Sequence, residues 1–128
     1  MTEKYAGLAY SVDVADIGEG ATYATASGEM NTNGCKCITL MPYATGANAS
    51  SAGVVTFNLV AMIGGKWCTT TWQSVTLTVS ATTEDVSPPV MLNCPGIQAV
   101  KVASIVNGDA TYHITNVNLI FASPRFFE

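Results

Sequence analysis

The sequence predicts an all-β protein, folded as a single antiparallel β-sandwich or jelly-roll-like domain. Apolar and polar residues alternate with a period of two through 55–61, and more strictly through 74–81, which is typical of strands with one buried face. The β-branched residues Val, Ile and Thr, which favour strands, number 36 of 128. Nowhere do apolar residues recur with the helical spacing over three turns.

The elements follow in chain order. Residues 1–21 offer little packing material and are expected to form an N-terminal arm or an edge strand. Residues 22–121 are expected to form the sandwich, and 122–128 an apolar C-terminal tail. Strands are predicted at 35–41, 55–61, 66–72, 74–81, 97–105 and 110–121.

Turn residues separate these strands. Gly64-Gly65 is a two-residue loop in which both positions can take positive φ, which predicts a hairpin. Asn107-Gly108-Asp109 gives a second hairpin signal, between the last two strands. Ser87-Pro88-Pro89 is expected to end the strand before it, because Pro cannot donate to a ladder. Residues 44–53, rich in Gly, Ser and Asn, are expected to form a loop.

Charge is scarce: the chain has five Lys or Arg and nine Asp or Glu, or 11% against about 25% in an ordinary domain. A hydrophobic fraction of 48% with a net charge of −4 excludes intrinsic disorder. The scattered cations give no footprint for nucleic acid. The longest apolar run, 59–63, is far shorter than the roughly 20 residues of a membrane helix. The polar start does not resemble a signal peptide, so we expect synthesis in the cytoplasm.

The cysteines do not have the spacing of a zinc site. Cys35 and Cys37 are a close pair, but Cys68 and Cys94 do not supply a second one. Cys35 and Cys37 fall on one face of a strand and are expected to fill the core. A Cys68–Cys94 disulfide is an alternative if the protein matures outside a reducing cell.

The acidic residues Asp13, Asp16 and Glu19 could in principle hold calcium, because carboxylates are hard oxygen ligands. Their spacing differs from that of an EF-hand loop, and a solvated acidic loop is the simpler interpretation. We therefore expect neither a metal nor another cofactor.

The chain carries no catalytic signature. His113 is the only histidine and lies in a strand-like run, with no nucleophile motif such as G-x-S-x-G. We expect its side chain to face solvent or a neighbour. Nucleotide-binding loops of the Gly-rich types are also absent from the sequence. The sequence therefore predicts a protein that is not an enzyme.

Aromatic side chains supply the candidate interface. Trp67 and Trp72 are five positions apart, so on one regular strand they would face opposite sides unless a bulge intervenes. One would then lie in the core and the other on the surface. Two consecutive Phe residues in the tail are costly to leave in water and are expected to fold back or to dock on another subunit. The candidate interface residues are Tyr5, Tyr10, Trp67, Trp72, Phe126 and Phe127.

Over residues 22–121 these patterns resemble small tailed-bacteriophage virion proteins of the head-decoration type. The run Gly65-Lys66-Trp67-Cys68-Thr69-Thr70 has the form G-x-W-x-T-T and precedes a Thr-rich strand. A strand, an N-G-D turn and a final strand follow. The resemblance implies a β-sandwich or jelly-roll protein, often trimeric, that sits on the major capsid protein lattice and reinforces it. It implies no catalytic residues.

The predicted function is therefore that of a structural virion protein on the capsid surface, made in the host cytoplasm. It would bind the assembled lattice as a homo-oligomer, with a trimer favoured, through multivalent contacts. The first alternative is a carbohydrate-binding β-sandwich with Trp67 or Trp72 as the stacking platform. A second is a phage tail or neck protein of the same fold.

Overall fold

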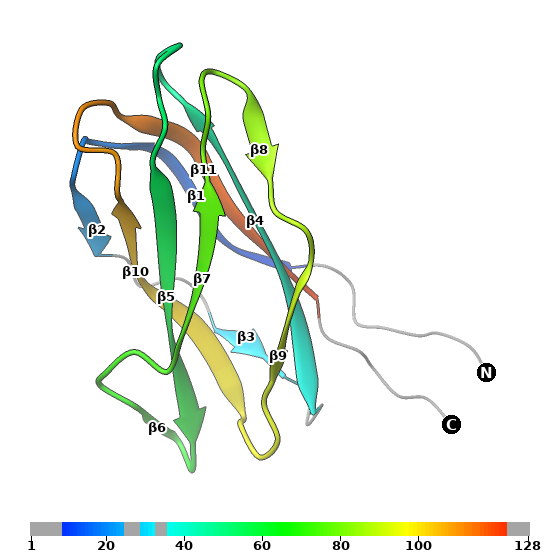
Figure 1. Ribbon diagram of the computed structural model, residues 1–128. Coiled ribbons are helices and arrows are strands. Elements are labelled where there is room, and N and C mark those ends of the chain that lie inside the picture. Colours follow the sequence, from blue (N-terminus) through cyan, green and yellow to red (C-terminus); the bar gives the residue numbers. More distant parts are fainter. Residues whose placement is uncertain (1–8, 25–28, 33–35, 123–128) are drawn as a thin grey trace.

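The computed structural model describes residues 9–24, 29–32 and 36–122, with the backbone alone for 9–13. These residues form eleven β-strands (Figure 1). The strands are β1 (Ala9–Ile17), β2 (Thr22–Ala24), β3 (Met30–Asn31), β4 (Cys37–Gly46), β5 (Val54–Ile63), β6 (Lys66–Trp67), β7 (Gln73–Thr78), β8 (Glu84–Val86), β9 (Val90–Asn93), β10 (Ala99–Asn107) and β11 (Ile114–Ala122). In the part of the chain that is described, no helix is long and apolar enough to span a membrane.

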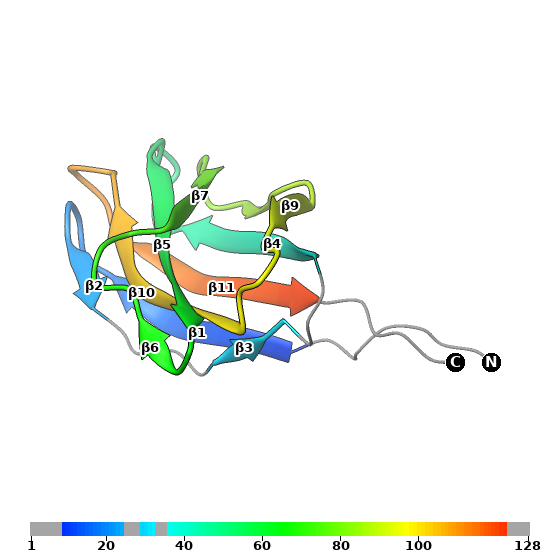
Figure 2. The same ribbon diagram turned by 90° about the horizontal axis from the view of Figure 1, so that it is seen from below.

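The strands form two antiparallel sheets. The first sheet has the order β1-β11-β4, and both β8 and β9 pair with the other side of β4. The second sheet is built on the pair β10-β5, with β2 and β3 beside β10 and with β6 and β7 beside β5. The two sheets lie face to face as a sandwich (Figure 2). The first described strand, β1, is an edge strand of the first sheet.

The strand pairing is nested. The first strand, β1, pairs with the last, β11; β2 and β3 pair with β10; β4 pairs with β8 and β9; and β5 pairs with β6 and β7. A chain that is doubled back on itself in this way and wound into two sheets is a jelly roll. The prediction of an all-β, antiparallel sandwich of jelly-roll type is confirmed.

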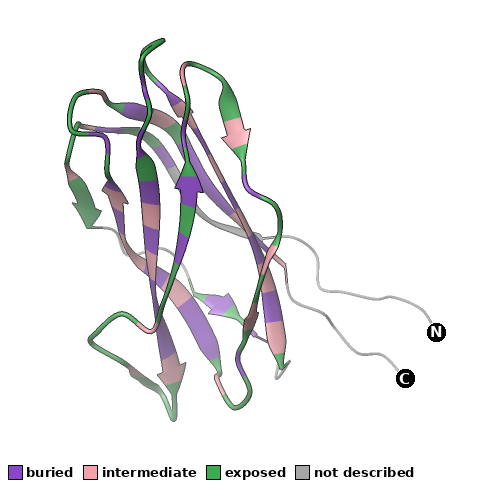
Figure 3. Ribbon diagram, viewed as in Figure 1, coloured by how far each residue is buried: buried purple, intermediate pink, exposed green. Residues whose placement is uncertain are grey.

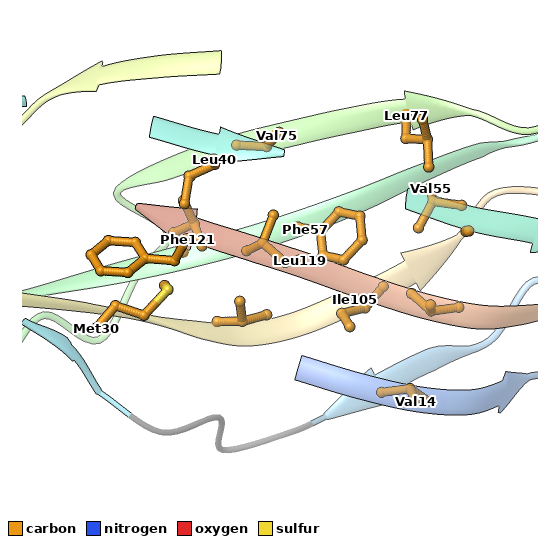
Figure 4. Packing of buried hydrophobic residues seen from close by; sticks show 14 of the residues in the cluster. Val14, Met30, Leu40, Val55, Phe57, Val75, Leu77, Ile105, Leu119 and Phe121 are labelled. Atoms are coloured by element: carbon orange, nitrogen blue, oxygen red, sulfur yellow. The ribbon is translucent and has the colours of Figure 1, made fainter. Parts of the chain in front are cut away.

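Buried residues recur along the strands of both sheets, as the purple bands in Figure 3 show, and their side chains form one core cluster. Side chains of β4 are alternately half-buried and buried over all ten residues. In β5 the alternation places Val55, Phe57 and Leu59 in the core with no exposed surface. Figure 4 shows Phe57 of the second sheet close to Leu119 of the first. The period of two at 55–61 therefore reports a buried face, as predicted.

The hairpin predicted at Gly64-Gly65 is confirmed. It joins β5 to β6, with Met62 opposite Trp67 and Ile63 opposite Lys66. Gly64 has a φ of 60° and Gly65 a φ of 78°, the left-handed conformations that a type I′ turn requires.

The second predicted hairpin, at Asn107-Gly108-Asp109, is wrong. Strand β10 belongs to the second sheet and β11 to the first, so this segment crosses between sheets. The predicted strand 110–121 accordingly begins only at Ile114. The side chains of Asn107 and Asp109 instead form hydrogen bonds that hold the connection between β10 and β11, as described below.

The Pro pair also has a different role from the one predicted. Strand β7 ends at Thr78, and Pro88-Pro89 lie later, between β8 and β9. Both of these strands lie at the edge of the first sheet, where Pro costs no ladder hydrogen bond. The loop expected at 44–53 begins only after Gly46, because β4 continues to that residue.

Candidate functional site: an apolar groove at the β5–β6 hairpin

A large bulge follows β6. The predicted strand 66–72 is regular only over Lys66–Trp67. The Cys68 N–H then donates to the carbonyl of Ala61 (2.9 Å) and the Trp72 N–H to that of Leu59 (2.8 Å). Five residues, 68–72, therefore lie opposite three residues of β5, which forces the intervening backbone out of the sheet.

The bulge brings both tryptophans to one apolar groove of about 300 Å³, which we call the Trp groove. It is lined by Ala61, Ile63, Lys66, Trp67, Cys68, Trp72 and Ile97. Both indole rings are half-buried, and Trp72 also packs against the core. The two tryptophans would have faced opposite sides on one regular strand, but the bulge that was named as the exception is present.

Positive charge borders this apolar surface. The Nζ of Lys101 lies 4.4 Å from the centroid of the Trp67 ring, a cation–π contact. Lys66 lies in the wall of the groove and is exposed. No acidic residue is among the lining residues. Two of the five cations of the chain therefore gather here.

The groove wall is held in place by hydrogen bonds to the segment before β10. The Gly65 N–H at the hairpin tip donates to Oε1 of Gln98 (3.0 Å), and the Gln98 N–H donates to the carbonyl of Met62 (2.9 Å). These bonds fasten the exposed hairpin to the neighbouring strand. The groove is thus a formed feature of the fold.

The Cys68 thiol forms hydrogen bonds within the bulge. The Cys68 thiol donates to the carbonyl of Thr70 (3.2 Å) and accepts the Ala61 N–H (3.3 Å), which stabilises the bulge. Cys68 is a free, exposed thiol, so the Cys68–Cys94 disulfide is not formed. Cys37 is half-buried, and Cys35 lies outside the described residues.

A charged cluster lies where β1 leads into the next turn. His113 contacts Oδ1 of Asp16 through Nδ1 (3.0 Å) and Oε1 of Glu19 through Nε2 (2.8 Å). Asp16, by hydrogen bonding and by charge, and then Glu19 raise the pKa of His113 above 6.5. Two of the three acids considered for calcium, Asp16 and Glu19, thus meet at an imidazole. The side chain of the third, Asp13, lies outside the described residues. Among the residues that are described, no group of His, Cys, Asp and Glu is arranged to hold a metal.

A polar network that the sequence analysis missed holds the crossing from β10 to β11. The buried Asn107 amide donates to the carbonyls of Ile17, Gly18 and Tyr112. The Asp109 carboxylate accepts N–H groups from Thr111, Ala52 and Tyr112, which hold its pKa below 3.8. The signal was present, because Asn and Asp are the residues whose side chains bond to nearby backbone; the hairpin interpretation hid it.

Comparison with solved structures adds a likeness in fold. A chain in the crystal structure of the T13 IBDV viral particle, reported as a missing link in the evolution of icosahedral viruses, superposes with a TM-score of 0.51 and 15% identity. The match covers 91% of this chain and 30% of the viral chain, so the protein corresponds to less than a third of its neighbour's length. No protein-family model matches the sequence, and no curated protein does.

The likeness to the viral chain therefore concerns the fold alone. Of the candidate interface residues, Trp67 and Trp72 meet in the Trp groove. Tyr10 belongs to β1, but its side chain lies outside the described residues, as do Tyr5, Phe126 and Phe127 altogether.

Proposed function

We propose that this protein is a structural, non-enzymatic component of a virus particle, and that it decorates and reinforces an assembled bacteriophage capsid. The observation that carries the proposal is the jelly roll shared with a chain of an icosahedral viral particle over nearly the whole of this protein. The resemblance of the 65–70 motif and the Thr-rich strands to head-decoration proteins supports the narrower assignment.

The outer face of the second sheet suits a broad protein contact. On β7 the outward residues Ser74, Thr76 and Thr78 are neutral and exposed. Ser74 donates to Oδ1 of Asn58 (2.7 Å), and the Asn58 amide donates to Oγ of Ser104 (3.1 Å), so a ladder of neutral side chains crosses three strands. These neutral side chains can be covered without burying unpaired charge, which is the costly part of forming an interface.

Capsid reinforcement requires no catalysis. A protein that binds the assembled lattice, but not free subunits, stabilises the shell by mass action. Many copies on one shell then multiply weak contacts. We propose the major capsid protein lattice as the partner and the capsid surface as the location, with the protein acting as a homo-oligomer and a trimer favoured.

The alternative of carbohydrate binding draws on the meeting of Trp67 and Trp72 in one groove. Sugar recognition also needs hydrogen-bonding groups, and among the described residues the groove wall contains no Asp, Glu, Asn or Gln. One face of Trp67 is already occupied by Lys101. Loss of binding on a glycan array in Trp67→Ala and Trp72→Ala would favour this alternative over decoration.

Co-sedimentation with particles tests the proposal. Purified protein is mixed with capsids of the virus that carries its gene, after removal of the resident copy, and bound protein and capsid melting temperature are measured. We expect saturable binding and a higher melting temperature. Thr76→Lys, on the neutral face, should weaken binding, whereas Thr82→Lys, exposed in the turn after β7, should not. A chain that never co-sediments would overturn the proposal, and cryo-electron microscopy of whole particles would separate a head from a tail or neck location.

A further inference from the structure

The Trp groove leaves apolar surface in water. Ile63 at its lip is 63% exposed, and the remaining wall is almost wholly hydrocarbon and indole. Exposed apolar surface in a concave, hydrogen-bonded setting is typical of a docking site. We propose that the Trp groove binds residues 123–128 of a second copy of this chain. This inference deepens the proposed function and rests on it for its biological setting.

The side chains of this segment complement those of the groove. After Ala122 the sequence continues Ser-Pro-Arg-Phe-Phe-Glu. Phe126 and Phe127 supply two aromatic rings for an apolar site bounded by indoles, where aromatic pairs gain more than their buried area. Pro124 restricts the backbone before them, which lowers the entropy lost on docking.

Charge fixes the direction of docking. Glu128 follows the Phe pair directly, and Lys66 and Lys101 border the groove without an acidic residue in its wall. A groove that takes both rings brings this carboxylate within side-chain reach of a lysine at the rim. Two of the five cations of the chain border the groove, which gives it a charge complementary to this carboxylate.

The position of β11 favours a neighbour's segment over the chain's own. The last described residue, Ala122, pairs with Thr39 in the first sheet, whereas β6 lies at the edge of the second. Figures 1 and 2 both place the end of β11 well away from β6. Six residues span at most about 20 Å when fully extended, and the path would have to pass around the sandwich.

Such a contact joins two different surfaces, so it is head-to-tail. Contacts of this kind close into rings when the rotation between copies allows it. The docked segment would thus be the link that makes a trimer from single jelly rolls.

Charge exchange tests the contact without disturbing the core. Lys66→Glu and Glu128→Lys should each shift the protein towards monomer in analytical ultracentrifugation, and the double variant should recover the oligomer. Phe126→Ser/Phe127→Ser and Ile63→Glu should each weaken self-association about tenfold or more. Thr82→Glu, exposed in the turn after β7 and outside both the groove and the segment, is the control and should leave the association state unchanged. Circular dichroism checks that every variant folds.

Mixing distinguishes a second copy from the chain's own segment. The Ile63→Glu protein keeps an intact segment, and the double Phe variant keeps an intact groove, so only their mixture should form dimers. A synthetic hexapeptide Ser-Pro-Arg-Phe-Phe-Glu should shift the tryptophan emission of the double Phe variant to shorter wavelength, and a peptide with Ser for both Phe should not.

Two results would overturn the inference. The first is that oligomers survive in all of these variants. The second is that the wild type is monomeric and the double Phe variant only has a lower melting temperature, which would mean that the segment docks within its own chain. Capsid binding by a monomeric variant would leave the proposed function standing, since that binding is measured separately.

Discussion

Asp109 lies at the crossing between the two sheets, where one carboxylate accepts N–H groups from two different loops. Oδ1 accepts from Thr111 and Tyr112, and Oδ2 accepts from Ala52 (3.1 Å). The residue is only 8% exposed, so these N–H groups would have no ready partner without it.

Asp109→Asn should lower the melting temperature by several degrees at neutral pH. The amide keeps one acceptor oxygen but turns an NH₂ group towards an N–H that needs an acceptor. Because folding lowers the Asp109 pKa, its contribution is present above pH 3.8 and is lost as the pH falls through the folded-state value. Melting curves of both proteins from pH 7 to pH 2 should therefore converge at the acid end; a constant difference would contradict the mechanism.

His113 should make stability depend on pH in the opposite sense. Its pKa is raised above 6.5 by Asp16 and Glu19, so protonation stabilises the folded state. That contribution is complete below about pH 6.5 and is lost as the pH rises through the folded-state pKa. The melting temperature of wild type minus that of His113→Gln should thus be larger at pH 6 than at pH 9. Because all three side chains are about half-exposed, salt at high concentration should reduce the difference.

At the residue scale, the sequence identified the chemistry of single side chains better than their neighbours. Trp67 and Trp72 line one groove, whereas strand periodicity without a bulge predicted opposite faces for them. The bulge that unites them depends on hydrogen bonds from Cys68 and Trp72 to β5, which no local pattern reveals. His113 was likewise expected to face solvent or a neighbour, and only the fold brings Asp16 and Glu19 to it.

At the element scale, β4 ends where the chain needs a residue without a side chain. A Cβ on Gly46 would collide with the carbonyl oxygen of Ala81 and lie 2.6 Å from Cβ of Ser51. Ala81 itself has a φ of 52°, a conformation that residues other than Gly rarely adopt. Only Gly therefore allows this close approach of the end of β4 to the turn after β7.

Gly46→Ala should destabilise the protein by about 1–3 kcal/mol, the usual cost of overpacking. Gly18→Ala is the matched control, because its added Cβ would meet neighbours only at 3.9 Å and its φ is not positive. That variant should change stability by less than about 1 kcal/mol. Urea unfolding of both proteins measures the difference; equal effects would contradict the account.

Strands were more predictable than their partners. Alternation located β5 and β7 because it reports which side chains face the core, whatever strand lies alongside. Turn residues such as Gly-Gly and Asn-Gly, by contrast, look the same in the sequence whether the turn closes a hairpin or begins a crossing between sheets. Gly64-Gly65 closes a hairpin because both residues adopt positive φ. At Asn107 the amide is buried and bonded to the loop after β1, and that bond commits the chain to the other sheet.

At the scale of the whole molecule, one core serves both sheets. Phe57, at the middle of β5, is wholly buried and faces the first sheet. Phe57→Ala should cost about 3–5 kcal/mol, a large part of the roughly 5–15 kcal/mol that stabilises a typical domain. Thr56→Ala, one residue away on the outward face, should cost less than about 1 kcal/mol. A single cooperative urea transition that shifts for Phe57→Ala alone would support one shared core; two separate transitions would contradict it.

The fold shows where the few charged and the many neutral side chains of the sequence lie. The neutral residues of β5, β7 and β10 bond to one another across the outer face of the second sheet, whereas two of the few cations border the Trp groove. Composition could indicate a surface suited to being covered. It could not show which face is neutral, because that depends on which strands become neighbours.

The nested pairing also sets when the protein can fold. Strand β1 is synthesised before the other described strands, yet among them it pairs only with β11, with Ala9 opposite Phe121 and Ile17 opposite Ile114. Folds dominated by contacts between distant parts of the chain form slowly, because the entropy cost of loop closure is incurred before the stabilising contacts form. An unfinished chain on the ribosome therefore lacks one side of its core. The jelly roll is completed only after synthesis has passed β11, so a chain broken off before β11 could not present a finished surface to other subunits.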